Sequence, residues 1–560
     1  MNESPPTQPR RAVWVPLFLS LVIIIAFGGL ATAEFSYLDD NYNLFENPRM
    51  NPPTWGSLAF YWTHQEHGLY VPLTYTVWSI LALIGHVSPD PLGIALNPWV
   101  FHCANIGIHV LSVLAVYALL MRLLNDGAAA CIGALLFGLH PVQVESVGWV
   151  AGLKDVLAGM LGAVALWQYA RWAQKPSPKP SPGVPGEGNG RAYIVATCAF
   201  VLALLAKPSA IVIPVIAGVI DLGVLRRRLL DVLVALMPWM VIAVVFAIIG
   251  SIAQPATGVP TAPYWARPLI MLDALAFYLY KLVFPFWLGV DYGRTPGYVM
   301  SHGWFYLTWL APVALAAILW INRRRWPEWI VSGLIFTAAL GPVLGLVTFL
   351  YQYRSTTADH YMYLAMLGPA LAAGVVVKRY RNPAVLVGSV VILGVLGAMT
   401  MLQTRVWGDD LELFTHALKV NPNSVMSLHN LGHAYAIRGH PERGVPYLKE
   451  AVERDPTYME SYEYLARLLK ESGRPAEAIP YRLKALELAE HRPAALQEFL
   501  TDQYVSVAQD LLDAGRLEEA RELFRKALNR SPDTPLAAQG LRIIEGKLGA
   551  PATSQVGKAG

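Results

Sequence analysis

The chain has 560 residues, of which 55% are hydrophobic and 15% charged, and its formal net charge is +4. A soluble globular protein carries about 25% charged residues, so this composition, with a mean hydropathy of +0.40, excludes an ordinary soluble protein. Lysine and arginine form no patch of the kind that binds nucleic acid. The apolar residues gather in runs of about 15 to 25 residues that end near residue 403, which is typical of transmembrane helices.

The first apolar run, at about 13–33, follows two arginines. Its Ala-Thr-Ala at 31–33 is similar to a signal-peptide cleavage site, but the run is longer than a signal core and many spans follow, so we expect an uncleaved first helix. With the N-terminus inside, residues 34–97 then lie outside. The short piece 71–84 is rich in Tyr and Trp, and we expect it to lie along the membrane interface.

The later runs predict about eleven spans in total. Two of them are short and are separated by Lys207-Pro208-Ser209. If every apolar run here crossed the membrane, the basic cluster at 323–325 would lie outside, so one run must not cross. We expect this run to be 267–288, which contains Lys281 and could be re-entrant. Residues 173–191 read AQKPSPKPSPGVPGEGNGR. This run of Pro, Gly and Ser predicts a flexible loop. The other expected spans lie at about 99–124, 128–148, 155–172, 231–252, 304–322, 328–350, 361–377 and 384–403.

Basic clusters stand at the edges of the apolar runs, and short basic loops stay in the cytoplasm. Under this rule the last span exits and the C-terminal part lies on the non-cytoplasmic side. The clusters are Arg10/Arg11, Arg171–Lys179, Arg226–Arg228, Arg323–Arg325 and Lys378/Arg379/Arg381.

From about residue 404 the composition becomes that of a soluble protein, and it repeats. Asn421-Pro422 recurs as Asp455-Pro456, and Gly439 recurs as Gly473, each 34 residues later. This period resembles tetratricopeptide repeats, whose paired helices leave a concave groove for peptide or protein. Further copies of the pattern include Ala466, Ala478 and Ala485, then Ala508, Gly515, Ala520, Phe524 and Ala527, and a half copy with Phe414, Ala417 and Pro422.

Several polar residues fall at the predicted outer ends of the spans, all on one side. Ionisable groups at membrane boundaries are costly, so we interpret this set as functional rather than as structural ion pairs. The set comprises Asp39, Asp40, His140, Glu145, Lys154, Asp155, Lys207, Arg354, Asp359 and His360.

These residue types point to transfer from a lipid-linked phosphate to an acceptor. A carboxylate takes a proton from a hydroxyl or holds a divalent cation, and lysine or arginine binds phosphate. Repulsion between Asp39 and Asp40 raises the proton affinity of one of them, or a metal relieves it. Asp40 is therefore also a candidate metal ligand, for Mg²⁺ or Mn²⁺.

Four segments carry a resemblance to a known family: YLDDNYNLFENP, FGLHPVQVESVGWVAGLKDVLAG, LLAKPSAIVIPV and ADHYMYLAMLG. With the C-terminal repeats, the chain resembles the transmembrane and tetratricopeptide repeat-containing proteins and, more broadly, the GT-C glycosyltransferases. The resemblance implies protein O-mannosyl transfer from a polyprenyl-phosphate mannose, with inversion at the sugar and a carboxylate of the first external loop acting at the acceptor hydroxyl.

By this resemblance Asp39 and Asp40 match the acidic pair, and Lys207 matches the donor-phosphate lysine. Two motifs depart from the family. Leu153-Lys154-Asp155 stands where Arg-Lys-Asp or Arg-Ala-Asp is usual, and Asp359-His360-Tyr361 stands where Asp-Arg-Tyr is usual. Each replaces a fixed positive charge, so the grip on the donor or the sugar identity could differ. His360 binds phosphate well only when protonated.

The sequence thus predicts an all-α chain: a polytopic membrane helix bundle at 1–403, an α-solenoid of tetratricopeptide repeats at 404–548 and a disordered tail at 549–560. The predicted function is a membrane glycosyltransferase whose donor is a polyprenyl-phosphate-linked sugar and whose acceptor is a protein Ser or Thr. Asp39 and Asp40 are the predicted catalytic residues. The predicted substrate-binding residues are His140, Glu145, Lys154, Asp155, Lys207, Arg354, Asp359, His360 and Tyr361.

Two other functions stay open from the sequence. One is a membrane-anchored scaffold with no catalysis, and the other is a ligase or polymerase for lipid-linked glycans. In a bacterium the protein would lie in the inner membrane, with lipid around its spans and the repeats outside, where an acceptor protein could dock on their groove.

Overall fold

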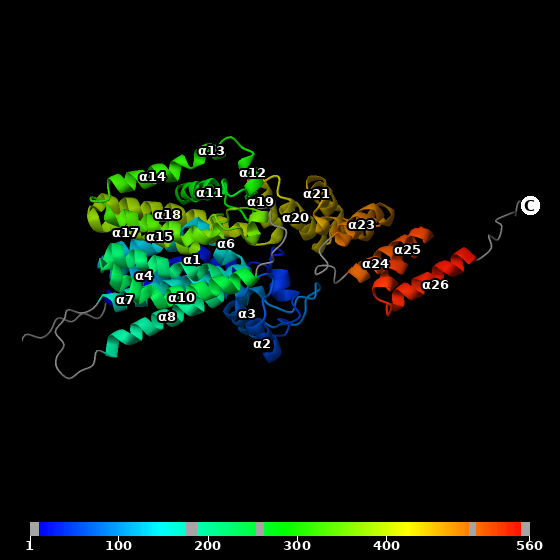
Figure 1. Cartoon of the computed structure of the whole chain (residues 1–560), viewed down its shortest axis with the longest axis horizontal. Helices are drawn as coiled ribbons and strands as arrows, with labels where there is room; N and C mark the ends of the chain where they lie inside the picture. The colour runs from blue at the N-terminus through cyan, green and yellow to red at the C-terminus, as the bar shows by residue number, and fades with distance from the viewer. Residues whose placement is uncertain (1–10, 175–186, 254–261, 492–499, 550–560) are drawn as a thin grey trace, which may run out of the picture. The chain divides into compact units, whose positions relative to one another are not determined.

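The structure is a computed structural model covering residues 11–174, 187–253, 262–491 and 500–549. Over these ranges it consists of helices and turns, with no β-strand. It divides into unit 1, up to Pro422, and unit 2, from Asn423 onward (Figure 1). Most of the predicted flexible loop 173–191 and of the predicted tail 549–560 lies outside the described residues.

Unit 1 is a bundle of apolar helices joined by short helical turns. Its longer helices are α1 (Arg11–Phe27), α4 (Pro98–Leu124), α5 (Gly127–Leu139), α7 (Leu153–Ala173), α8 (Glu187–Ala206), α10 (Leu229–Ala253), α11 (Arg267–Val283), α14 (Leu310–Ile321), α15 (Pro327–Leu340), α17 (Leu367–Arg379) and α18 (Pro383–Val406). The shorter ones are α2 (Trp55–Thr63), α3 (Pro72–Ile84), α6 (Val144–Gly148), α9 (Ile213–Ile220), α12 (Pro296–Met300), α13 (Phe305–Thr308), α16 (Met362–Ala365) and α19 (Asp410–Val420).

Within the described ranges, six helical stretches are long and apolar enough to cross a membrane. Two bent pairs, Gly127–Leu139 with Pro141–Gly148 and Asp359–Ala365 with Leu367–Arg379, pass the same test, with bends of 52° and 49°. The remaining predicted spans, between 190 and 206, 304 and 322, and 328 and 350, correspond to shorter apolar helices. The six stretches are Trp14–Thr32, Pro98–Leu124, Val150–Ala173, Pro208–Leu225, Leu229–Ala253 and Pro383–Val406.

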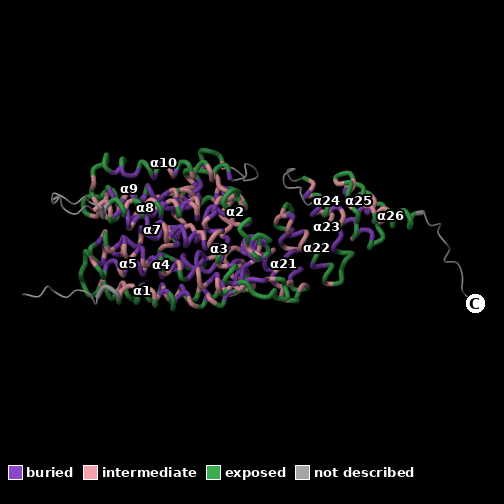
Figure 2. The backbone as a smooth tube through the Cα atoms, turned by 90° about the horizontal axis from the view of Figure 1, so that it is seen from below, coloured by how far each residue is buried: buried purple, intermediate pink, exposed green. Residues whose placement is uncertain are grey.

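The helices of unit 1 differ in how deeply they lie in the bundle (Figure 2). The most apolar window of the span that contains α7 is 72% buried, whereas the windows of α10 and α18 are 28% and 17% buried. The outer helices therefore expose leucine, valine and isoleucine over most of their length. A soluble monomer rarely exposes apolar surface of this extent, so these faces fit contact with lipid.

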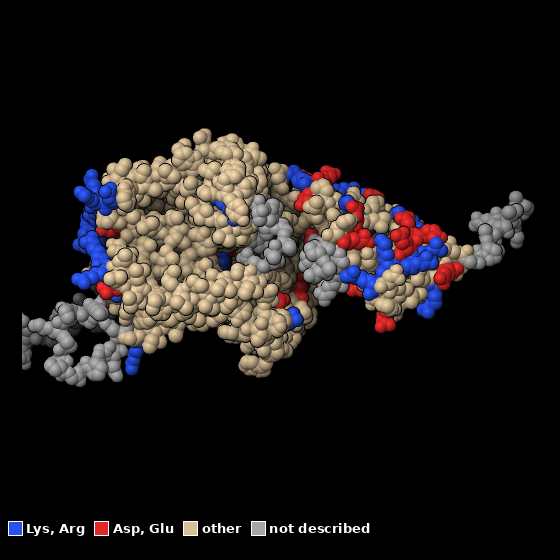
Figure 3. Space-filling view, in the orientation of Figure 1, with Lys and Arg blue, Asp and Glu red and all other residues tan. Residues whose placement is uncertain are grey.

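Basic residues of several predicted clusters, among those that the structure describes, lie at one end of unit 1, where Figure 3 shows Lys and Arg gathered. Arg381 Nη2 lies 2.7 Å from Asp126 Oδ2, and Arg379 donates a 2.9 Å hydrogen bond to the Arg325 carbonyl. α5 begins at Gly127 at this end, and α7 ends at Ala173, two residues after Arg171. The opposite ends of α5 and α7 carry the polar residues singled out above, as the topology requires.

Close backbone packing joins α5 to α17. A Cβ added at Gly133 would lie 2.5 Å from the Ala370 carbonyl oxygen, closer than real Cβ atoms approach. Replacing Gly133 with alanine is therefore expected to lower the free energy of unfolding by about 1–3 kcal/mol, measured by thermal unfolding in detergent. Gly107→Ala is the control, since no atom lies within 4 Å of a Cβ there and alanine favours a helix by about 1 kcal/mol over glycine. Equal stability of the two variants would contradict this packing.

Unit 2 consists of helix pairs, as the 34-residue period predicts. The turn between the helices of each pair contains a glycine with a left-handed backbone: Gly439, Gly473 and Gly515 have φ of 77°, 74° and 76°. Other residues rarely adopt this conformation, which explains why glycine recurs at this position. The helices are α20 (Val425–Ile437), α21 (Pro441–Arg454), α22 (Met459–Glu471), α23 (Pro475–Glu490), α24 (Leu500–Asp513), α25 (Leu517–Arg530) and α26 (Pro535–Gly549).

The small residues of the repeat pattern lie in the core of unit 2. Ala466, Ala508, Ala520 and Ala527 are at most 1% exposed, which lets paired helices approach closely. The predicted half copy with Phe414 and its neighbours falls in α19, which belongs to unit 1. The compact membrane unit therefore extends beyond residue 403.

Candidate active site

The loop after α1 places its two adjacent aspartates in different surroundings. Asp40 is 1% exposed. Its Oδ2 accepts a 3.0 Å hydrogen bond from the Ser36 backbone N–H, and its Oδ1 accepts a 2.8 Å bond from the Ala151 backbone N–H. Asp40 therefore connects the loop after α1 to the turn before α7, and both of its oxygens already accept hydrogen bonds from the backbone.

Burial raises the pKa of Asp40 to about 7. The two backbone hydrogen bonds oppose this shift, and the charges of Asp39 and Asp410 add to it. Repulsion from Asp39 thus raises the pKa of Asp40, as the sequence predicts, but desolvation is the larger cause because the carboxyl group lies inside the protein.

Asp39 is only partly buried. Its Oδ1 accepts a hydrogen bond from the Tyr42 hydroxyl. Partial burial raises the pKa of Tyr42, Asp39 raises it further, and the positive charge of Arg354 lowers it. Asp39 and Tyr42 are therefore in contact, and Arg354 is near enough for its charge to act on Tyr42. Asp39 is the aspartate of the pair that an acceptor could reach.

A third carboxylate fixes the same loop. Asp410 of α19 accepts a 2.6 Å hydrogen bond from Ser36 Oγ and a 3.0 Å bond from the Tyr37 backbone N–H. The sequence gives no sign that Asp410 belongs to the site, because more than 370 residues separate it from the loop. It also lies in a stretch whose composition is that of a soluble protein.

His140 does not join the other candidate residues. Its Nε2 donates a 3.1 Å hydrogen bond to the Leu282 carbonyl, and its Nδ1 accepts a 3.4 Å bond from the Val142 N–H. Both ring nitrogens therefore contact the backbone, Nδ1 at the break between α5 and α6 and Nε2 at the end of α11.

Glu145 accepts hydrogen bonds from the Asp359–His360 turn. Its Oε2 accepts the backbone N–H groups of Asp359 and His360, at 3.0 and 3.3 Å. Its Oε1 lies 2.7 Å from His360 Nδ1. The contact between the Glu145 carboxyl group and Nδ1 fixes the orientation of the His360 ring.

Asp359 faces away from this turn, toward a loop that the sequence analysis did not single out. Its two oxygens lie 2.8 and 2.9 Å from the Tyr292 hydroxyl, which donates to them. Lys281 Nζ lies 4.9 Å from the centre of the Tyr292 ring and donates 2.7 and 2.9 Å bonds to the carbonyls of Phe286 and Trp287. Asp359 is thus held inside the protein, 2% exposed, rather than open to a substrate.

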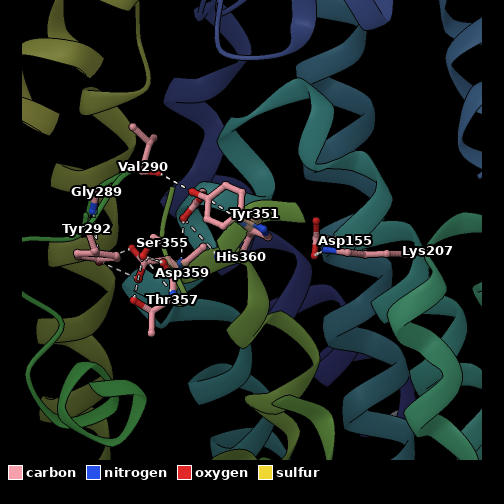
Figure 4. A network of polar contacts seen from close by, with 12 residues as sticks. Asp155, Lys207, Gly289, Val290, Tyr292, Tyr351, Ser355, Thr357, Asp359 and His360 are labelled. Atoms are coloured by element: carbon pink, nitrogen blue, oxygen red, sulfur yellow. Dashed lines mark hydrogen bonds and ion pairs between the residues drawn. The ribbon is translucent and has the colours of Figure 1, made fainter. Parts of the chain in front are cut away.

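Asp155 and Lys207 form a buried ion pair between α7 and the turn after α8 (Figure 4). Lys207 Nζ contacts Asp155 Oδ1 and lies 5.6 Å from the centre of the Tyr361 ring. Asp155 Oδ2 is buried and has no hydrogen-bond partner among the described residues. One oxygen of the carboxylate thus neutralises the lysine, and the other can still accept a hydrogen.

A small cavity adjoins this ion pair. Its volume is about 40 Å³, and Asp155, Lys207, Ser209, His360 and Tyr361 are among the residues that line it. This volume is large enough for a water molecule but too small for a hexose. A sugar would enter only if groups around the ion pair moved.

Lys154 and Asp39 complete the surroundings of His360. Lys154 Nζ lies 5.0 Å from the Trp149 ring, whose centre is 5.9 Å from that of His360. Lys207 reaches the same place through the Tyr361 ring, whose centre is 4.3 Å from that of His360, and Asp39 is near enough for its charge to act on His360. The structure therefore gathers most of the predicted set at one end of unit 1.

The metal expected at Asp40 does not fit its surroundings. Both oxygens of Asp40 are directed at backbone N–H groups. Across the described ranges no three His, Cys, Asp or Glu side chains cluster as they do at a Mg²⁺ or Mn²⁺ site.

Known proteins resemble both parts of the chain. Tetratricopeptide repeat models match residues 413–445 and 447–479 and residues 501–531. The chain is 22% identical to protein O-mannosyl-transferase TMTC3 of Mus musculus over 555 residues, 88% of this chain and 58% of that protein. It is 23% identical to protein O-mannosyl-transferase F38B6.6 of Caenorhabditis elegans over 489 residues, 82% of this chain and 64% of that protein.

Among solved structures, ArnT from Cupriavidus metallidurans bound to undecaprenyl phosphate aligns with a TM-score of 0.35 and 16% identity, over 86% of this chain and 81% of that one. The chain spans less than two thirds of the length of the two protein O-mannosyl-transferases, 58% and 64%. The resemblance expected from the sequence motifs is confirmed: along 88% of its length the chain is related to the TMTC protein O-mannosyl-transferases, and it carries tetratricopeptide repeats.

Proposed function

We propose that the chain is a membrane glycosyltransferase that moves a sugar, mannose by relationship, from a polyprenyl-phosphate donor to Ser or Thr hydroxyls of a protein. The observation that carries the proposal is the gathering of Lys154 and Lys207 around His360 through the Trp149 and Tyr361 rings. The Asp39 loop is joined to Ala151 of the same region by the neighbouring Asp40, and Lys154 lies at the end of α7 opposite Arg171. The similarity to proteins named protein O-mannosyl-transferases supports the same reaction.

Lys207 and Lys154 are the proposed ligands of the donor phosphate. Lys207 is neutralised by Asp155 before the donor arrives, so the phosphate competes with a carboxylate for the ammonium group. Arg354, next to Tyr42 on the Asp39 side, is a further cation within the site. Positive charge here stabilises the phosphate that leaves as the sugar–oxygen bond breaks.

Asp39 is the proposed general base, because it is the accessible member of the pair. It takes the proton of the acceptor hydroxyl while the hydroxyl oxygen attacks the anomeric carbon. The bond from that carbon to the phosphate oxygen breaks, the polyprenyl phosphate leaves, and attack from the opposite face inverts the anomeric centre. Asp40 holds the loop that presents Asp39, through its bonds to Ser36 and Ala151.

The distribution of charge supports the non-cytoplasmic side of the membrane for this site. Basic loops stay in the cytoplasm, so the site at the other end of unit 1 would face the non-cytoplasmic side, which is the periplasmic side of the inner membrane in a bacterium. The groove of the unit 2 repeats is the proposed docking surface for the acceptor protein.

Two other functions remain to be distinguished. A scaffold without catalysis predicts no transfer by any variant. A ligase or polymerase predicts a pyrophosphate-linked oligosaccharide donor. The experiment is transfer by the purified full chain in nanodiscs, with labelled polyprenyl-phosphate mannose or labelled polyprenyl-pyrophosphate oligosaccharide and Ser/Thr peptides. We expect label in the peptide only with the monophosphate donor; transfer only from the pyrophosphate donor would refute the proposal.

A further inference from the structure

A tight turn of the first external region contacts Tyr42, which in turn contacts the proposed base. Glu66 and Leu69 exchange backbone hydrogen bonds of 3.0 and 2.9 Å around His67-Gly68. His67 has φ of 49° and Gly68 of 74°. Two consecutive positive φ values define a type I′ turn, whose first central position favours Asn, Asp or Gly. A histidine there carries backbone strain that glycine would not.

The strained residue places its ring on Tyr42. The centres of the His67 and Tyr42 rings are 4.7 Å apart, with an angle of 58° between the ring planes. The Tyr42 hydroxyl in turn donates to Asp39 Oδ1. Three side chains thus form a row from the turn to the carboxylate.

All three members of this row reach the surface. The side chain of His67 is 43% exposed and Tyr42 is 38% exposed, and Asp39 is partly buried. Without contacts between them, the exposed Tyr42 and the partly exposed Asp39 side chains would each sample several rotamers in water. The ring of His67 restricts Tyr42, and Tyr42 restricts Asp39.

We propose that His67 and Tyr42 are positioning residues that hold the Asp39 carboxylate in one orientation toward the acceptor hydroxyl. The strain at His67 persists because it puts an aromatic ring at this point. The proposal rests on the function proposed above only for the role of Asp39, since the row itself is a property of the loop. A misplacement of a reacting group by about 1 Å costs about a hundredfold in rate, so loss of the row should appear in kcat.

The test uses His67→Gly, which removes the ring and also relieves the backbone. If His67 only supported the fold, this variant would be less stable than the wild type but as active per folded molecule. We expect equal or higher thermal stability with a kcat lower by about tenfold or more, and an unchanged KM for the donor. His67→Phe, which keeps a ring on Tyr42, should restore most of kcat.

A double variant shows whether the residues act in a row. Tyr42→Phe removes the hydroxyl that contacts Asp39, and His67→Gly added to it should lower kcat no further, because residues that act through one another are not additive. Additive losses, or an unchanged kcat in His67→Gly, would overturn the proposal.

A chemical readout separates this inference from the transfer reaction. Carboxyl labelling with a water-soluble carbodiimide, followed by mass spectrometry, measures the accessibility of Asp39 in the full chain in detergent. We expect several-fold faster labelling of Asp39 in His67→Gly and Tyr42→Phe than in the wild type. The control is Asn125→Gly, which relieves a positive φ of 50° at the far end of α4 and should change neither labelling nor kcat. Equal labelling in all four proteins would refute the row even if transfer occurs, and a labelling difference without any transfer would refute only the proposed function.

Discussion

Asp39→Asn is expected to abolish sugar transfer without loss of stability, whereas Asp40→Asn is expected to destabilise the protein. Asp39 is partly exposed and contacts Tyr42, so its amide fits the same space but cannot take a proton. General-base catalysis contributes about 10²–10⁴-fold in rate, and transfer should fall by that factor.

At Asp40 the same substitution places an NH₂ group against a backbone N–H. One of the Ser36 and Ala151 donors then loses its acceptor. An unsatisfied buried polar group costs about 1–3 kcal/mol, so the unfolding temperature should drop. Asp410→Asn is the matched control, because it also loosens the loop through Ser36 and Tyr37 without touching the aspartate pair.

Both quantities come from one set of purified proteins, in which transfer is measured per folded molecule and stability by thermal unfolding in detergent. If Asp40→Asn abolished transfer at full stability while Asp39→Asn remained active, the roles assigned to the two aspartates would be reversed.

Removing Lys207 has the second large expected effect. Lys207→Gln leaves Asp155 buried and without its counter-charge, with the carboxyl side chain only 5% exposed. Breaking a buried ion pair by removing one partner costs about 3–5 kcal/mol. Donor binding should be lost as well, because the ammonium group is a proposed phosphate ligand.

A double variant separates the two effects. Lys207→Gln with Asp155→Asn replaces the ion pair by two neutral amides, so most of the stability should return. Transfer should stay absent, because the cation is still missing. Recovery of transfer in this double variant would show that Lys207 has only a structural role.

The exposed pair Arg381–Asp126 at the basic end is the matched control. The Arg381 side chain is 74% exposed, and surface ion pairs contribute about 0–1 kcal/mol. Arg381→Gln should therefore leave stability and transfer nearly unchanged.

The sequence predicts the repeats of unit 2 well, because their signal is local and periodic. Glycine at 439, 473 and 515 marks a backbone conformation that other residues avoid. The positions of the long apolar helices are also predictable, since a run of hydrophobic residues with almost no charge has few alternatives.

The division of labour between Asp39 and Asp40 was not predictable. The two residues are adjacent and identical in type, and only the folded loop gives one two backbone donors and leaves the other partly exposed. The pairing of Asp155 with Lys207 depends on two helices meeting across 52 positions. Tyr292 lay in a loop with no motif, so nothing in the sequence linked it to Asp359.

His140 makes contacts that its motif did not predict. Its place beside Glu145 in a motif favoured a role in substrate binding, but in the structure both of its ring nitrogens contact the backbone. A polar residue at a break between apolar helices meets unpaired N–H and C=O groups there, and capping them is a sufficient reason for its presence.

The most direct measurement is the initial rate of mannose transfer from polyprenyl-phosphate mannose to a Ser/Thr peptide by the full chain in nanodiscs, for the wild type and Asp39→Asn at equal amounts of folded protein. We expect measurable transfer by the wild type and an initial rate about 10²–10⁴-fold lower in the variant. Equal rates for the two proteins would contradict the central claim that this carboxylate, gathered with the lysines at one end of the bundle, activates the acceptor.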